Sequence, residues 1–138
     1  SPWMPSTYVW LGIEGLAGIE PLAAGPARVR IEPNLPAGWR WLGGRGIRLG
    51  PDELAFFLLD GTLHVAGCAV TSSRPIENYE ADATHEVESD APFTVALRRG
   101  GELAVFVAAD EPAPVRVAHG ARIERLDLGA GEARMLRL

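Results

Sequence analysis

Short segments of alternating polar and apolar residues, separated by turn-forming residues, limit the fold of this chain more than any other feature of its sequence. Four segments alternate as half-buried strands do: RVRIE (28–32), THEVES (84–89), FTVALR (93–98) and LAVFVAA (103–109). LAFFLL (54–59) is continuously apolar, which favours a strand buried on both faces. Asp60-Gly61, which follows it, predicts a two-residue hairpin turn into TLHVAG, because both residues tolerate positive φ.

The spacing of these segments indicates the architecture. About ten short strands recur at intervals of roughly 8 to 12 residues, which is typical of an antiparallel sandwich or barrel. No sustained alternation of strands with helices and no repeat of constant period accompanies them. We therefore predict a mostly β protein built as an antiparallel β-sandwich, with residues 72–83 (SSRPIENYEADA) as a long surface loop.

A different segment precedes the strands. Pro5, Ser6 and Thr7 can cap a helix, and residues 8–19 place apolar side chains in nearly every direction at helical spacing. Gly12, Gly15 and Gly18 recur every third residue, so another backbone could approach closely; partly irregular structure is the alternative. We expect Pro21 to end the helix, which divides the chain into an apolar helix (1–21) and a β-sandwich domain (22–138).

Composition and charge exclude several classes of partner. A net charge of −5 on 138 residues argues against a nucleic acid or an anionic membrane as the partner. The first ten residues lack the basic region and the cleavage site of a signal peptide, and the apolar stretch after them is too short to span a bilayer. The cellular location stays open, with the cytoplasm favoured. Cys68, the single cysteine, lies in the apolar run VAGCAV, where we expect a buried structural thiol.

The titratable residues do not form a recognisable catalytic or metal motif. His64, His85 and His119 lack metal-ligand spacing, and His64 alternates with apolar neighbours, so we expect it on the outer face of a hairpin. Acidic residues gather between positions 77 and 90: Glu77, Glu80, Asp82, Glu86, Glu88 and Asp90. On a strand Glu86, Glu88 and Asp90 would point the same way. A solvated strand face is favoured over a calcium site or a pair of hydrolytic carboxylates, and no catalytic residue, metal or cofactor is predicted.

Two tryptophans are candidates for a binding site. Trp39 and Trp41 are two residues apart, so on a strand both rings would face one side of the sheet. Exposed rings in that arrangement could stack on sugar rings and bind carbohydrate. Alternatively, they fill the core of the sandwich or cover the opening helix.

Residues 2–49, PWMPSTYVWLGIEGLAGIEPLAAGPARVRIEPNLPAGWRWLGGRGIRL, resemble the join between two domains in glycosidases that have an (α/α)6 toroid. Examples of this group are the bacterial α-L-rhamnosidases and the glycogen-debranching amylo-α-1,6-glucosidase relatives. In that group the last toroid helix, of Gly-Leu-x-Gly-Ile type, passes through a proline into a C-terminal β-sandwich whose early strands look like RVRIEPNLPAGW (28–39).

The resemblance implies that the chain is a non-catalytic C-terminal module of a glycoside hydrolase whose catalytic domain lies upstream. Trp3, Tyr8, Val9 and Trp10 would then pack against that domain, or mediate self-association in its absence. The catalytic carboxylates of the family lie in the toroid, so none is assigned here. Two alternatives remain, a carbohydrate-binding module that uses Trp39 and Trp41 and a free-standing sugar-modifying enzyme of β-sandwich or cupin type.

Overall fold

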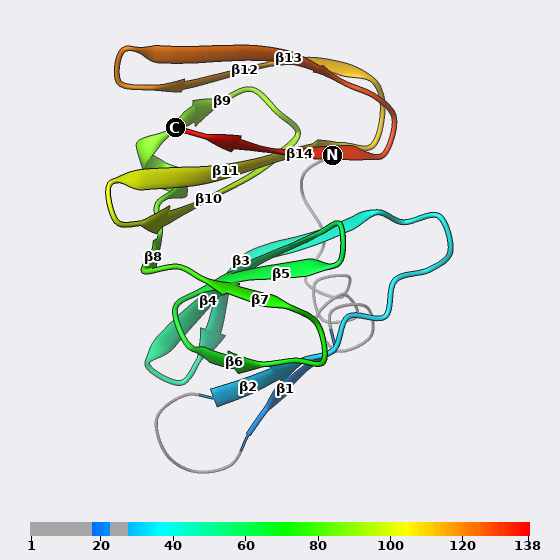
Figure 1. Cartoon of the computed structure of the whole chain (residues 1–138), viewed down its shortest axis with the longest axis vertical. Coiled ribbons are helices and arrows are strands. Elements are labelled where there is room, and N and C mark those ends of the chain that lie inside the picture. The colour runs from blue at the N-terminus through cyan, green and yellow to red at the C-terminus, as the bar shows by residue number, and fades with distance from the viewer. Residues whose placement is uncertain (1–17, 23–27) are drawn as a thin grey trace.

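The computed structural model describes residues 18–22 and 28–138, and these residues are mostly β, as predicted. They form four sheets (Figure 1). Sheet A contains β1 (Ile19–Pro21), β2 (Arg28–Ile31) and β6 (Ala69–Thr71), and sheet B contains β3 (Trp41–Leu49), β4 (Asp52–Leu59), β5 (Thr62–Ala66) and β7 (Ile76–Asn78). Sheet C contains β8 (Ala81–Asp82), β10 (Phe93–Arg99), β11 (Glu102–Ala109) and β14 (Glu132–Arg137). Sheet D contains β9 (Glu88–Ser89), β12 (Ala113–His119) and β13 (Arg122–Leu128), and a short 3-10 helix, η2 (Thr84–Glu86), lies between β8 and β9.

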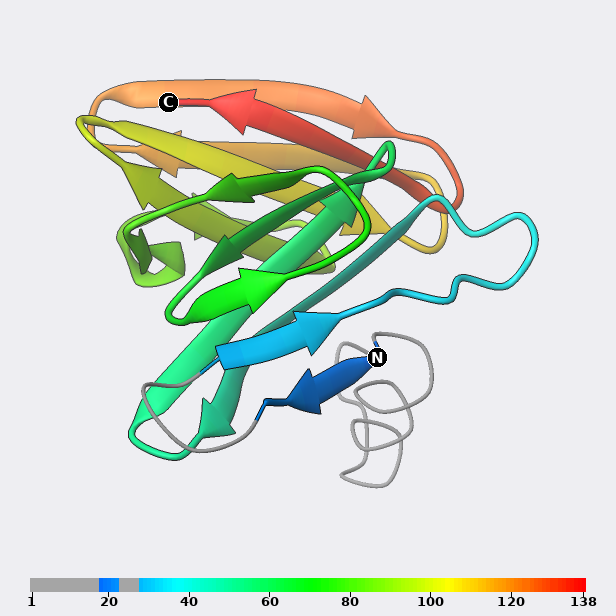
Figure 2. The same ribbon diagram turned by 60° about the horizontal axis from the view of Figure 1, so that its bottom comes forward.

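The four sheets are stacked in the order A, B, C, D, from the bottom to the top of Figure 1. Figure 2 shows β1 and β2, in blue, on the opposite side of the molecule from the orange and red C-terminal strands. Three hydrophobic clusters fill the spaces between successive sheets. The sandwich-like fold is therefore a pair of sandwiches, A with B and C with D, joined face to face where B meets C.

Strands of the two inner sheets are apolar on both faces because each face contacts another sheet. In β4, Leu54, Phe56 and Leu58 belong to the cluster between A and B, whereas Ala55 and Phe57 belong to the one between B and C. The prediction that LAFFLL is buried on both faces is therefore confirmed.

Strand β11 is built in the same way. Leu103, Val105 and Val107 face sheet D, and Ala104 and Phe106 face sheet B. The prediction that LAVFVAA (103–109) forms a half-buried strand is therefore wrong in one respect: the segment is a strand, but both of its faces are covered.

The predicted turns form hairpins. Asp60 (φ 50°) and Gly61 (φ 81°) connect β4 to β5, with Leu59 paired to Thr62, and positive φ at both positions is what such a turn requires. Gly100 and Gly120 likewise have positive φ in the turns between β10 and β11 and between β12 and β13. The pairing of β10 with β11 and of β12 with β13 follows from these local signals, whereas the pairing of β11 with β14 does not.

Several strand predictions need correction. The segment THEVES (84–89) is not one strand, because η2 occupies Thr84–Glu86 and only Glu88–Ser89 extends as β9. Residues 72–83 are not one long loop, since β7 and β8 lie within them. WRWL and GIRL contribute to a single strand, β3, which pairs with β4 through a bulge between Gly44 and Ile47. The described residues thus contain fourteen strands where about ten were predicted.

The N-terminal helix is not supported within the described residues. Where its last residues were expected, Ile19–Pro21 form β1, which pairs with β2. Gly18 has φ 59°, and a Cβ there would lie 2.2 Å from the carbonyl oxygen of Glu32. The close backbone approach inferred from the glycines therefore occurs at Gly18, but with Glu32 of the same chain. The rest of the predicted helix, Tyr8 to Ala17, lies outside the described residues.

Candidate functional site

The contact between sheets B and C brings together the chemically distinctive side chains of the described residues. We call this contact the junction; Ala55, Phe57, Val95, Leu97, Ala104 and Phe106 form most of its core. An aromatic row runs through it from Trp41 to Tyr79. Trp41 stacks on Phe57 with ring centroids 5.5 Å apart, Phe57 on Phe106 at 4.8 Å, and the His64 ring lies 4.7 Å from Phe106 and 5.7 Å from Tyr79.

The packing of rings at the Trp41 end of the aromatic row depends on a glycine. Gly43 lies across from Phe57 in the β3–β4 pair, and a Cβ on Gly43 would come within 2.7 Å of both Phe57 and Phe93. Phe93 in turn stacks on Trp41 with centroids 5.5 Å apart. The absence of a side chain at Gly43 therefore makes room for the three rings that close this end of the junction.

His64 is buried inside the junction, so the expectation that it faces outward is wrong. It is 7% exposed and is the one buried polar or charged residue among those the structure describes. The alternation of TLHVA placed it correctly on the face opposite Leu63 and Val65, but sheet C covers that face. Its Nδ1 lies 2.9 Å from the hydroxyl of Tyr79.

The environment keeps the His64 imidazole neutral. Burial lowers its pKa from 6.5 to about 4; Glu77 opposes this change, and Arg99 and Arg137 reinforce it. Burial also raises the pKa of Tyr79, so the phenol holds its proton. Two neutral groups thus share one hydrogen bond inside an apolar contact.

Polar side chains cover this end of the junction. Arg99 lies over the Tyr79 ring at the end of the aromatic row, with its guanidinium carbon 4.6 Å from the centre of that ring. Its Nη1 donates to Oε2 of Glu77 at 2.6 Å, and this hydrogen bond lowers the pKa of Glu77. Because Glu77 lies in sheet B and Arg99 in sheet C, the pair connects the two sheets.

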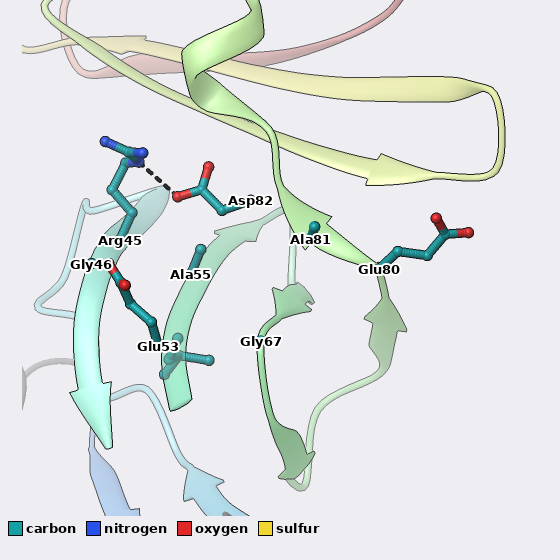
Figure 3. Close-up of a pocket in the computed structure, with 9 residues that line it drawn as sticks. Arg45, Gly46, Glu53, Ala55, Gly67, Glu80, Ala81 and Asp82 are labelled. Carbon is teal, nitrogen blue, oxygen red and sulfur yellow. Dashed lines mark hydrogen bonds and ion pairs between the residues drawn. The ribbon is translucent and has the colours of Figure 1, made fainter. Parts of the chain in front are cut away.

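A pocket of about 370 Å³ opens at another edge of the same two sheets (Figure 3). Arg45 of β3 donates from Nε to Oδ2 of Asp82 in β8 at 2.9 Å, a second ion pair between sheets B and C. Asp82 also accepts hydrogen bonds from the backbone and hydroxyl of Thr84. Burial raises the pKa of Asp82, but these hydrogen bonds together outweigh burial, so the pKa is lowered. The side chain of Glu80, on the rim, points away from the pair.

The acidic residues between positions 77 and 90 do not form one strand face. Glu77 and Asp82 pair with arginines as described, and Glu86 pairs with Arg98. Glu80 accepts a hydrogen bond from the backbone of Gly100, and Asp90 accepts one from the backbone of Arg116.

The expectation that Glu86, Glu88 and Asp90 point the same way is wrong, since Glu86 lies in η2. Within residues 18–22 and 28–138 no group of three or more His, Cys, Asp or Glu residues could hold a metal ion.

The two candidate tryptophans have different surroundings. Trp39 lies before β3, in the turn where its backbone N–H donates to the carbonyl of Pro36 at 3.1 Å, and the residue is 52% exposed. Trp41 begins β3, is half-buried, and stacks on Phe57 and Phe93.

Cys68 is half-buried against the cluster between sheets A and B, and burial raises the pKa of its thiol. Trp3, Tyr8, Val9 and Trp10, the predicted packing residues, lie outside the described residues.

Sequence reasoning missed Tyr79 as the hydrogen-bond partner of His64 and Arg99 as the residue that lies over Tyr79. Tyr79 lies in the segment predicted to be a loop, and Arg99 ends an ordinary hairpin strand. The available signal was the hydrogen-bonding capacity of His64, which requires a partner once the second face of β5 is covered. That face is covered because sheet C stacks on sheet B, and no local sequence pattern indicates this stacking.

Comparison with known protein families, with curated proteins and with solved structures finds no match for this chain. None of the helices in the described residues is long and apolar enough to cross a membrane.

Proposed function

We propose that this chain is a non-catalytic accessory module of a carbohydrate-active enzyme, in which its β-sheets support a neighbouring catalytic domain of the (α/α)6 type. The N-terminal segment, with Trp3, Tyr8, Val9 and Trp10, is the part that packs against that domain. The proposal rests on the resemblance of residues 2–49 to the join between toroid and sandwich.

One structural observation carries the non-catalytic part of the proposal. The side chains best suited to chemistry are already paired with one another: His64 with Tyr79, Glu77 with Arg99, and Asp82 with Arg45. Each pair crosses or closes the junction. A general acid or base needs to reach a substrate, whereas Glu77–Arg99 and Asp82–Arg45 join sheet B to sheet C and His64–Tyr79 lies buried between the two sheets.

The experiment starts from the reading frame upstream of Ser1. We expect several hundred codons with the periodicity of helical hairpins, ending in the segment 1–17. A protein carrying both parts is then compared with a variant lacking residues 18–138. We expect the truncated toroid to lose solubility or thermal stability, and the isolated module to show no activity on chromogenic glycosides. A module that hydrolyses these substrates after repurification would contradict the proposal.

A second candidate function is carbohydrate binding, and the exposure of Trp39 favours it. A ring that is 52% exposed on a surface turn can stack on a sugar. Because Trp41 also supports the junction, Trp39→Ala is the cleaner test. Titration of oligosaccharides, followed by tryptophan fluorescence, should show binding that weakens at least tenfold in Trp39→Ala. Equal affinity in the two proteins would exclude Trp39 as the platform.

A further inference from the structure

His64 has surroundings that suit only a neutral imidazole. Its ring lies between Phe106 of sheet C and Tyr79, which follows β7 of sheet B. The charged groups around it are Glu77 on β7, Arg99 on β10 and Arg137 on β14. Two of the three are cationic, and the one anion, Glu77, is already paired with Arg99. A proton added to the imidazole would therefore be poorly compensated.

His64 is only 7% exposed, and two neighbouring side chains form its cover. The cover consists of Tyr79, whose hydroxyl bonds to Nδ1, and Arg99, which lies over the Tyr79 ring. Tyr79 is tied to sheet B through its N–H, which donates to the carbonyl of Val65 at 2.8 Å. The next residue, Glu80, donates its N–H to the carbonyl of Arg98 in sheet C at 2.7 Å. Residues 79 and 80 thus join the two sheets directly beside the histidine.

We propose that the junction is an acid-sensitive latch, in which protonation of His64 displaces the Tyr79–Arg99 cover and loosens sheet B from sheet C. A charged imidazole is strongly favoured in water over an apolar contact, so its hydration drives the cover outward. Movement of Tyr79 breaks the backbone bonds of residues 79 and 80. The consequence is local opening at the 78–83 crossover between the two sandwiches, while the hairpin of β10 and β11 stays closed.

Hydrogen exchange measured by mass spectrometry tests the latch directly. The protection of residues 76–83 is followed from pH 7 to pH 4 and compared with that of residues 102–109 in β11. In the wild type, protection of 76–83 should fall by roughly 100-fold over this range, which corresponds to the difference between a pKa of 6.5 in the open state and about 4 in the closed state. Protection of 102–109 should fall much less.

Two variants complete the test. His64→Gln keeps a hydrogen-bonding side chain but does not titrate, so its protection at 76–83 should change less than tenfold over the same range. His85→Gln is the matched control, because His85 is an exposed histidine outside the junction, and it should behave like the wild type.

Either of two results would overturn the latch. One is an unchanged pH profile in His64→Gln, which would assign the acid sensitivity to the carboxylates. The other is a simultaneous loss of protection at 76–83 and 102–109, which would mean that acid unfolds the whole chain. If His64→Gln fails to fold, an NMR titration of the wild-type imidazole decides the question. The latch requires His64 to titrate below pH 5, together with the loss of protection at residue 79, and titration near pH 6.5 without that loss contradicts it.

Discussion

The two sandwiches differ in both their cores and their strand connections. Between sheets A and B most of the buried side chains are isoleucine, leucine and phenylalanine, among them Ile31, Leu54 and Phe56. Between sheets C and D most of the buried side chains are valine and alanine, for example Val105 and Val117. The N-terminal sandwich includes two parallel pairs, β2 with β6 and β5 with β7, whereas every pair of the C-terminal one is antiparallel.

This difference shows two ways of specifying a sandwich. In the C-terminal one, two hairpins with locally encoded turns, β10–β11 and β12–β13, form the centre, and every further strand adds to them in antiparallel orientation. In the N-terminal one, two pairs are parallel, and a tight turn cannot connect parallel strands. Val29 pairs with Val70, and this contact needs bulky residues and close backbone approaches rather than a turn. The junction then couples the two through the aromatic row.

The largest expected effect comes from emptying the centre of the junction. Phe57 is fully buried and stacks on Trp41 and Phe106. We expect Phe57→Ala to lower the free energy of unfolding by about 3–5 kcal/mol, measured by urea denaturation. The control is Ile123→Ala in β13, an exposed side chain whose loss should change stability by less than about 0.5 kcal/mol. A loss below about 1 kcal/mol for Phe57→Ala would show that the sandwiches hardly depend on each other.

Glycine substitutions sharpen the comparison of the two halves. In the N-terminal half Gly67 has φ 103°, and a Cβ there would lie 1.9 Å from the carbonyl oxygen of Glu53. We expect Gly67→Ala to lower the free energy of unfolding by about 3 kcal/mol. The added Cβ must push the backbone of Glu53 away, and an alanine at this positive φ is strained as well. In the C-terminal half Gly100, at φ 62°, has open space around it, so Gly100→Ala should cost only about 1 kcal/mol. Thermal unfolding of both variants gives the difference, and equal costs would refute the distinction.

A smaller effect is expected at the ion pair beside the pocket. Asp82→Asn should lower stability at pH 7 by about 1 kcal/mol, since the charged carboxylate accepts from Arg45 and Thr84. The folded-state pKa of Asp82 is lowered below the ordinary 3.8, so this contribution is complete above pH 3.8 and disappears as the pH falls through the folded pKa. Urea denaturation at pH 7 and at pH 2 checks this sign. A difference between wild type and variant that persists at pH 2 would assign the effect to packing.

The hairpins and the doubly buried strand β4 could be predicted from the sequence, because turn residues and apolar runs act locally. Asp60-Gly61 is an example: its residues determine both the turn and the register of β4 against β5. The number of layers could not be predicted in this way. Alternation distinguishes two faces of a strand but does not say whether the second face meets water or another sheet. His64 was therefore placed on the correct face and given the wrong surroundings.

The ion pairs could not be predicted from the sequence for a related reason. Arg45 and Asp82 are 37 residues apart and meet only after sheets B and C have stacked. Likewise, THEVES alternates as a strand, yet Asp82 accepts hydrogen bonds from both the backbone and the hydroxyl of Thr84, and a 3-10 turn begins there. Side-chain to backbone bonds of this kind compete with strand formation.

Hydrogen exchange in increasing urea at pH 7 tests most directly whether the junction joins the two sandwiches into one folding unit. The residues to follow are 54–58 in sheet B and 103–109 in sheet C, both fully buried. We predict that the two segments lose protection at the same urea concentration in the wild type, and at the same lower concentration in Phe57→Ala. Separate midpoints in the wild type, with Phe57→Ala moving only that of sheet B, would show that two independent sandwiches merely touch.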